Sequence, residues 1–88
     1  MLYKKLQSFE YNILKKYNWS NYYSKEGILI VQFDDDKQTI GINNRRLFGA
    51  AVSNLVAEKG MDEDGNINRI GEELEMAYDI FLASEECH

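Results

Sequence analysis

Gly-Ile-Leu-Ile-Val-Gln-Phe-Asp-Asp-Asp-Lys-Gln-Thr-Ile-Gly-Ile, residues 27–42, is the stretch that decides the fold. Residues 28–33 are rich in β-branched side chains and have the length of a strand, and residues 39–42 form a natural partner strand. The segment between them begins with three aspartates, which favour turns because their side chains bond nearby backbone groups. The stretch therefore predicts an antiparallel β-hairpin with an acidic turn at Asp34, Asp35 and Asp36.

Two helices are predicted after this hairpin. The first runs up to Lys59 and Gly60, with Asn43 or Asn44 suited to cap its N-terminus. Its apolar stripe consists of Leu47, Phe48, Ala51, Val52, Leu55 and Val56. The second helix is predicted over residues 69–86, after a polar link at residues 61–68, and its core stripe consists of Ile70, Leu74, Ala77, Tyr78, Phe81 and Leu82.

Each of these helices carries an unusual second face. In the first helix Gly49, Ser53 and Ala57 recur at steps of four, and such a small face admits a second helix at close range. The second helix has another apolar stripe opposite its core stripe, formed by Met76, Ile80, Ala83 and Cys87. A helix with two apolar stripes is either sandwiched within the fold or exposes one stripe as an interface. In the second case, a two-fold homodimer is the simplest way to cover the exposed stripe.

Upstream of the hairpin, apolar residues at steps of three and four predict a helix over residues 2–17. Residues 19–24 break this pattern and predict a loop or a short edge strand. The whole chain, residues 1–88, is therefore predicted to be one α+β domain. It consists of an N-terminal helix, a short antiparallel β-hairpin or three-stranded meander, and two C-terminal helices, in the order α-β-β-α-α.

The charge of −5 is distributed unevenly along the 88 residues. Residues 1–33 carry five lysines against two glutamates, residues 34–60 are balanced, and residues 61–88 carry one arginine against nine acids. Such an acidic end repels nucleic acid and is steered toward basic protein surfaces. No apolar run approaches the roughly 18 residues of a membrane span, and no signal segment follows Met1, so we expect a cytoplasmic protein without membrane contact.

The chain offers little for catalysis. Its single histidine and single cysteine, His88 and Cys87, lie at the C-terminus, and no glycine-rich phosphate-binding motif occurs. Residues 62–67 resemble half of an EF-hand calcium loop, but glycines occupy the first and twelfth ligand positions, and an Asp-Gly turn explains the same residues. We therefore expect a non-enzymatic protein without a cofactor or a metal.

Two surfaces are candidates for binding a partner. The main one is acidic with an apolar strip and consists of Asp34, Asp35, Asp36, Glu72, Glu73, Glu75, Met76, Asp79 and Ile80. A secondary one combines lysines with aromatic side chains that could stack the bases of single-stranded nucleic acid, namely Lys4, Tyr11, Lys15, Trp19, Tyr22 and Tyr23. The acidic C-terminal part makes a basic protein surface the expected partner, and nucleic acid is not expected.

In layout the chain resembles small acidic inhibitors encoded by phages, such as anti-CRISPR proteins. Several of these place a helix, a short antiparallel sheet with an acidic turn like residues 33–37, and acidic helices like residues 72–86 in a similar length. The resemblance implies a non-enzymatic inhibitor in the host cytoplasm whose carboxylates occupy a basic surface of a nucleic-acid-processing enzyme. Toxin-immunity proteins fit the same description. A homodimerising adaptor and a small single-stranded nucleic-acid-binding module are the alternatives.

Overall fold

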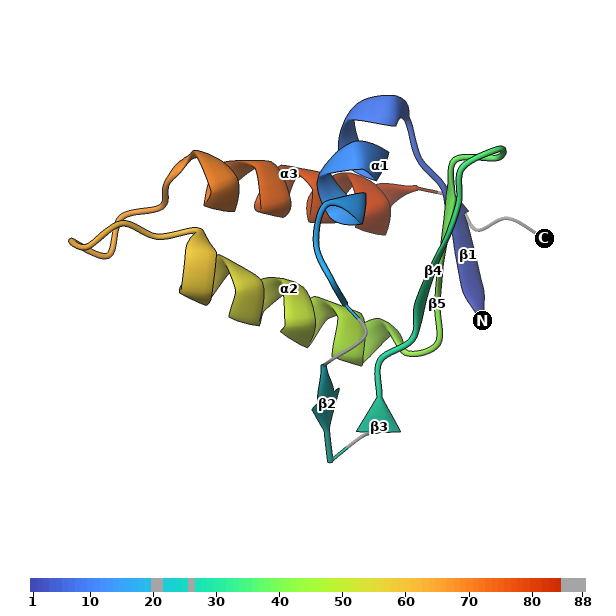
Figure 1. Ribbon diagram of the computed structural model, residues 1–88, viewed down its shortest axis with the longest axis horizontal. Coiled ribbons are helices and arrows are strands. Elements are labelled where there is room, and N and C mark those ends of the chain that lie inside the picture. The colour runs from blue at the N-terminus through green and yellow to red at the C-terminus, as the bar shows by residue number, and fades with distance from the viewer. Residues whose placement is uncertain (20–21, 26, 85–88) are drawn as a thin grey trace.

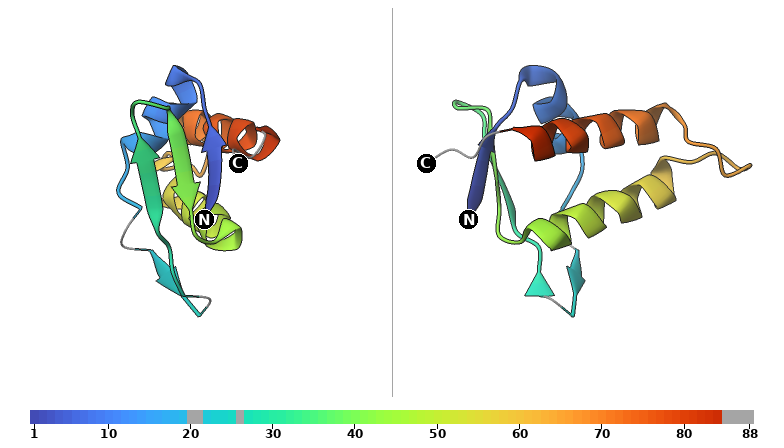
Figure 2. Two further views of the ribbon diagram at one scale, coloured as in Figure 1. Left: turned by 90° about the vertical axis from the view of Figure 1, so that its right-hand side faces the viewer. Right: turned by 180° about the vertical axis from the view of Figure 1, so that it is seen from behind.

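A three-stranded antiparallel sheet lies against three helices in the computed structural model, which describes residues 1–19, 22–25 and 27–84 (Figure 1). The elements follow the order β1 (Leu2–Lys5), α1 (Ser8–Lys15), β2 (Tyr23–Ser24), β3 (Gly27–Ile28), β4 (Val31–Asp34), β5 (Thr39–Ile42), α2 (Arg45–Lys59) and α3 (Arg69–Ala83). The helices lie on one side of the sheet, and no described element covers its other face (Figure 2). The fold is α+β, as the sequence predicts.

The N-terminal segment is a strand, β1, followed by a short helix, α1, so the helix predicted over residues 2–17 is confirmed over Ser8–Lys15 and is wrong over Leu2–Lys5. β1 pairs antiparallel with β5 and completes the sheet order β1-β5-β4. α1 begins only at Ser8, where a capping box forms and the Gln7 backbone N–H donates to the Glu10 carboxylate at 2.8 Å. The four-residue step from Leu2 to Leu6 fits a strand as well as a helix, because four is also a multiple of the two-residue strand period.

The predicted hairpin is confirmed as β4 and β5, which pair with Phe33 opposite Ile40. The first strand is shorter than predicted, because the Asn43 side chain takes the place of a strand partner near its start. It donates to the carbonyl oxygen of Ile28 at 2.8 Å and accepts from the backbone N–H of Ile30 at 2.7 Å. β3 pairs instead with β2, so the edge strand predicted within residues 19–24 belongs to a separate two-stranded ribbon.

The two long helices begin and end close to the predicted residues. Asn44 caps α2 by accepting from the Leu47 backbone N–H at 3.1 Å, and Asn68 caps α3 by accepting from the Gly71 backbone N–H at 3.0 Å. Helix α3 ends at Ala83, before the predicted end at residue 86. The predicted helical positions Glu85 and Glu86, and Cys87 of the predicted second apolar stripe, lie outside the described residues.

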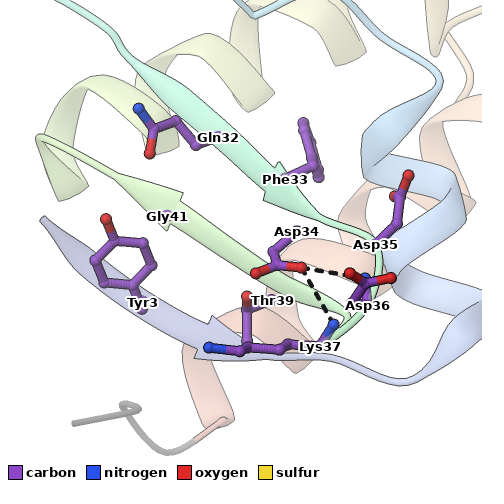
Figure 3. A pocket seen from close by; sticks show the side chains of 9 residues that line it. All are labelled: Tyr3, Gln32, Phe33, Asp34, Asp35, Asp36, Lys37, Thr39 and Gly41. Atoms are coloured by element: carbon purple, nitrogen blue, oxygen red, sulfur yellow. Dashed lines mark hydrogen bonds between the residues drawn. The ribbon is translucent and has the colours of Figure 1, made fainter.

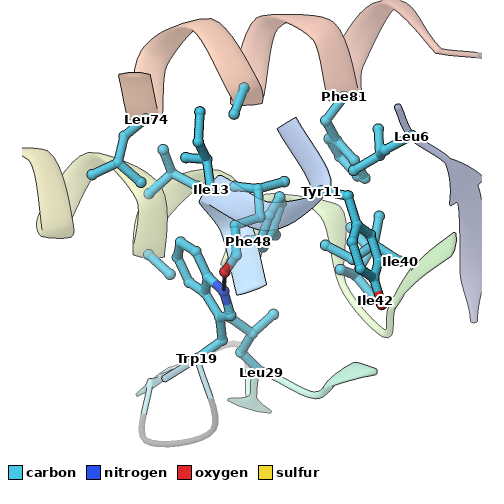
Figure 4. Close-up of a cluster of buried hydrophobic side chains, with 14 of the residues drawn as sticks. Leu6, Tyr11, Ile13, Trp19, Leu29, Ile40, Ile42, Phe48, Leu74 and Phe81 are labelled. Atoms are coloured by element: carbon cyan, nitrogen blue, oxygen red, sulfur yellow. Dashed lines mark hydrogen bonds between the residues drawn. The ribbon is translucent and has the colours of Figure 1, made fainter. Parts of the chain in front are cut away.

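The hydrophobic core fills the space between the sheet and the helices (Figure 4). Phe48 of α2 lies at its centre, with ring centroids at 5.0 Å from Phe81, 5.2 Å from Trp19 and 5.8 Å from Tyr78. The predicted stripe of α2 is buried apart from Leu55, which is half-buried. Burial of such aromatic and aliphatic surface is the main stabilising contribution to folding.

The core stripe of α3 is narrower than the sequence predicts. Leu74, Ala77 and Phe81 are buried, whereas Ile70 and Leu82 are exposed. Ile70 lies in the first turn of α3 and Leu82 lies in its last turn, at the two ends of the helix. Their exposure corrects the prediction that all six apolar residues of this stripe are buried.

Two glycines bring the chain of α2 against the chain of α3. A Cβ atom placed on Gly60 would lie 2.7 Å from the Cα atom of Gly71, and one placed on Gly71 would collide with the Gly60 carbonyl oxygen. The same carbonyl oxygen accepts from the Asn68 backbone N–H at 2.8 Å. The C-terminal end of α2 and the first turn of α3 therefore meet in a backbone contact that a larger residue at either glycine would prevent.

Lys4 joins the first strand to the last helix. Its side chain is only 2% exposed, and its Nζ atom donates to the carbonyl oxygens of Phe81, at 2.7 Å, and Leu82, at 3.2 Å. The ammonium group also lies 4.6 Å from the centre of the Phe81 ring. A cation is favourable at this position because the last carbonyl groups of a helix lack intrahelical donors and carry partial negative charge.

We predict that Lys4→Met lowers the free energy of unfolding by about 2 to 4 kcal/mol, because it removes a charged donor and leaves buried carbonyl groups without it. Lys5→Met, at the exposed neighbouring residue, is the matched control and should change stability by no more than about 0.5 kcal/mol. Urea unfolding followed by circular dichroism measures both. Equal stability of the two variants would contradict the role given to Lys4.

Candidate functional site

The first aspartate of the acidic turn shapes the turn itself. An Oδ atom of Asp34 accepts from the backbone N–H groups of Asp36, at 3.1 Å, and Lys37, at 3.3 Å (Figure 3). Gln38 then adopts a φ of 49°, in the left-handed region, before β5 begins. Asp34 is therefore explained by turn formation, as its residue type predicts.

The second aspartate connects the turn to α1. Asp35 accepts from the Tyr11 hydroxyl at 2.6 Å and forms an ion pair with Lys15. The hydrogen bond from Lys15, followed by that from Tyr11, lowers the pKa of Asp35. Burial, and next the hydrogen bond to Asp35, raises the pKa of Tyr11. Of the three aspartates, only Asp36 has a side chain with no hydrogen bond or ion pair to another described residue.

We predict that Asp35→Asn destabilises the protein at neutral pH and that this difference from the wild type shrinks as the pH falls. Folding lowers the pKa of Asp35, so its ionised form stabilises the fold above its unfolded pKa and loses this contribution as the pH falls through the folded pKa. Thermal unfolding at a series of pH values measures the effect. Asp36→Asn is the control, and a difference between Asp35→Asn and wild type that does not depend on pH would contradict the assignment.

The uncovered face of the sheet carries a groove of about 750 Å³ (Figure 3). Tyr3 lies opposite Gly41 in the strand register, and its ring occupies the space where a side chain of Gly41 would be. Both Asp36 and Lys37 line this groove, so its charge is mixed. The ring covers the glycine and needs no ligand to explain its position.

The outer side of α3 carries a group of exposed carboxylates. Glu72, Glu75, Met76 and Asp79 are exposed and follow the three- and four-residue steps of one helix side. We call these four residues the acidic face. The carboxylates of the acidic face make no hydrogen bond or ion pair within the described parts of the chain. Its methionine is 48% exposed.

The remaining predicted residues of α3 differ from the acidic face. Glu73 is half-buried and pairs with Arg69 at 3.3 Å, and Ile80 is half-buried. The second apolar stripe is therefore not buried as a unit, because Met76 and Ala83 stay exposed. The acidic turn and the acidic face line separate hollows that share no residue, so the predicted acidic surface is divided into two parts.

A second groove, of about 400 Å³, runs between α2 and α3. Its lining includes Glu75 and Asp79 of the acidic face, together with Tyr78 and Ser53. The sequence places Tyr78 in the core stripe of α3 and gives no indication of this groove. The small face of α2 was the sequence signal for close contact with another helix. Of its residues, Gly49 is approached by α3, since a Cβ atom on Gly49 would lie 2.6 Å from the Tyr78 hydroxyl oxygen, whereas Ser53 and Ala57 are exposed.

The secondary, nucleic-acid-binding surface is not assembled. Lys4 points into the fold, Tyr11 is 4% exposed, and Trp19 is 4% exposed with its indole N–H donated to the Leu14 carbonyl oxygen at 2.7 Å. Lys15 is paired with Asp35, Tyr22 is half-buried, and only Tyr23 is largely exposed. Aromatic rings must be open on one face to stack bases, so the described side chains do not form the stacking surface that the sequence suggested.

We predict that oligonucleotides of DNA or RNA leave the fluorescence of Trp19 unchanged at physiological salt. The indole ring is enclosed by the core and its only donor is already used. A fluorescence titration checks this, with acrylamide as a control for the accessibility of the ring. Strong quenching by an oligonucleotide would show that the N-terminal region opens to bind nucleic acid.

The link between α2 and α3 forms the predicted Asp-Gly turn. Asp62 accepts from the backbone N–H groups of Asp64, at 3.0 Å, and Asn66, at 2.9 Å, and Gly65 has a φ of 82°. The described residues contain no group of three acidic, histidine or cysteine side chains arranged to hold a metal ion. None of the helices built from them has the length and apolar character needed to span a membrane.

Comparisons of the chain with protein families, with curated proteins and with solved structures give no match.

Proposed function

We propose that this protein is a non-enzymatic inhibitor that uses the acidic face of α3 to occupy a basic surface of a target protein. The observation that carries the proposal is that the exposed carboxylates of the acidic face make no hydrogen bond or ion pair to any residue that the structure describes. Asp34, Asp35 and Asp62 serve turns and ion pairs, whereas Glu75 and Asp79 serve no described contact. A basic target would supply the missing counter-charges.

Helix energetics support this assignment. Glu72 lies in the first turn of α3, where a negative charge interacts favourably with the helix N-terminus. Glu75 and Asp79 lie beyond that turn and are spaced four residues apart, where like charges destabilise an isolated helix by roughly 0.2 to 0.5 kcal/mol. Folding thus gains nothing from this pair, and binding to a cationic surface would relieve their repulsion.

The location of Met76 fits a protein partner. An exposed methionine between carboxylates offers an adaptable apolar contact inside a charged rim, which is the usual arrangement of protein interfaces. Association driven by this face should slow as salt is raised, because exposed charges act mainly on the association rate. Occupation of the target's basic surface would exclude its normal anionic ligand, and this exclusion is the proposed inhibitory activity.

The test reverses the charge of the acidic face. Glu72→Lys, Glu75→Lys and Asp79→Lys are combined in one variant, and Asp36→Lys, Glu58→Lys and Glu63→Lys in its control. Each reversal adds two charges, so either triple variant changes the net charge from −5 by +6 to +1. We expect tagged wild type and the control to retain the same protein from nuclease-treated extract of the source cells and the acidic-face variant to lose it.

Retention of that protein by the acidic-face variant would contradict the proposal. The purified target should also lose activity when wild-type protein is added and keep its activity with the acidic-face variant. In the homodimer alternative, the retained protein is a second copy of this chain, and sedimentation of wild type then gives a dimer. That outcome would support a homodimerising adaptor as the function and contradict the proposed inhibitor.

A further inference from the structure

The groove between α2 and α3 combines an apolar floor with a negative rim. Val52 and Val56, both buried residues of α2, form the floor. Glu75 and Asp79 stand on the α3 side, one helical turn apart, and neither carboxylate has a hydrogen bond or ion pair to another described residue. Among the described residues that line the groove there is no lysine or arginine. A ligand that fits must therefore be apolar along its length and positively charged at its end.

The walls of the groove are held in place by the core. Tyr78 reaches across to Gly49 of α2, and its ring stacks on Phe81 at 6.1 Å with an interplanar angle of 17°. Ser53 is small, which keeps the α2 side open, and exposed Met61 borders the end near the interhelical link. The groove, at about 400 Å³, lies within the roughly 300 to 1,000 Å³ of clefts that hold small ligands.

We infer that this groove receives an arginine side chain of the target protein, with its aliphatic stem on Val52 and Val56 and its guanidinium group between Glu75 and Asp79. This inference rests on the proposed function and identifies which group of the basic partner enters the site. Arginine fits better than lysine because its planar guanidinium donates along several directions to two carboxylates at once. It also packs favourably beside an aromatic ring such as that of Tyr78.

A titration with N-acetylarginine amide, followed by amide NMR shifts, tests the inference on the isolated protein. N-acetylcitrulline amide is the matched ligand, because it has nearly the same shape without the charge. We expect the arginine ligand to shift the resonances of Ser53, Val56, Glu75 and Asp79 with a dissociation constant on the order of millimolar, and the citrulline ligand to leave them unchanged. Equal shifts with both ligands, or shifts confined to other residues, would overturn the inference.

Paired variants distinguish binding in the groove from a general effect of the protein's net charge. Glu75→Gln combined with Asp79→Asn should abolish the arginine shifts, whereas Asp36→Asn combined with Glu63→Gln, with the same change in net charge at residues outside the groove and the acidic face, should keep the dissociation constant within twofold. Ser53→Trp should block the groove while leaving every carboxylate in place. Circular dichroism confirms the fold of each variant, and the Gln/Asn pair decides the question if Ser53→Trp does not fold.

The inference and the proposed function can fail separately. If Ser53→Trp retains the target while the triple reversal of the acidic face loses it, the inhibitor proposal stands and the arginine site is wrong. If the arginine shifts occur as expected while the triple reversal still retains the target, the groove binds arginine but the acidic face is not the surface that holds the target.

Discussion

The contact of Lys4 with the end of α3 is the constraint on which the rest of the fold depends. It joins residues 77 positions apart, and it places the first strand beside the last helix. A buried ammonium group is costly unless its donors are used, and here the carbonyl groups of Phe81 and Leu82 use them. With β1 fixed in this way, β5 becomes the central strand, and the core closes between the sheet and the three helices of the described chain.

The sequence predicts those elements whose signals are local. The hairpin and the N-terminus of α2 are recognisable because the turn aspartates and the cap at Asn44 act on backbone groups a few residues away. β1 is not recognisable, because the four-residue step from Leu2 to Leu6 also fits a helix and its partner strand lies far along the chain. Lys4 was assigned to a binding surface because lysine is usually exposed, and only the tertiary fold brings helix carbonyl groups to it.

The candidate site, like the fold, is predicted from the sequence only in part. Residue counting identifies acidic segments, but it cannot tell which carboxylates already accept hydrogen bonds inside the protein. The sequence alone does not distinguish the roles of Asp34 and Asp35 from those of Glu75 and Asp79. In the structure, Asp34 accepts hydrogen bonds from the backbone of its own turn, and Asp35 connects the turn to α1. The spacing of Glu75 and Asp79 on one helix face was readable, whereas the groove beside them depends on how closely α2 and α3 pack.

The contact between Gly60 and Gly71 has an evolutionary consequence. Because each glycine occupies the space that a side chain on the other would need, neither position tolerates even alanine without moving a helix. Distant relatives of this protein should therefore keep a small residue at both positions, after the helix equivalent to α2 and inside the first turn of the helix equivalent to α3. This pair gives a spaced signature by which such relatives can be recognised when overall identity is too low to align them.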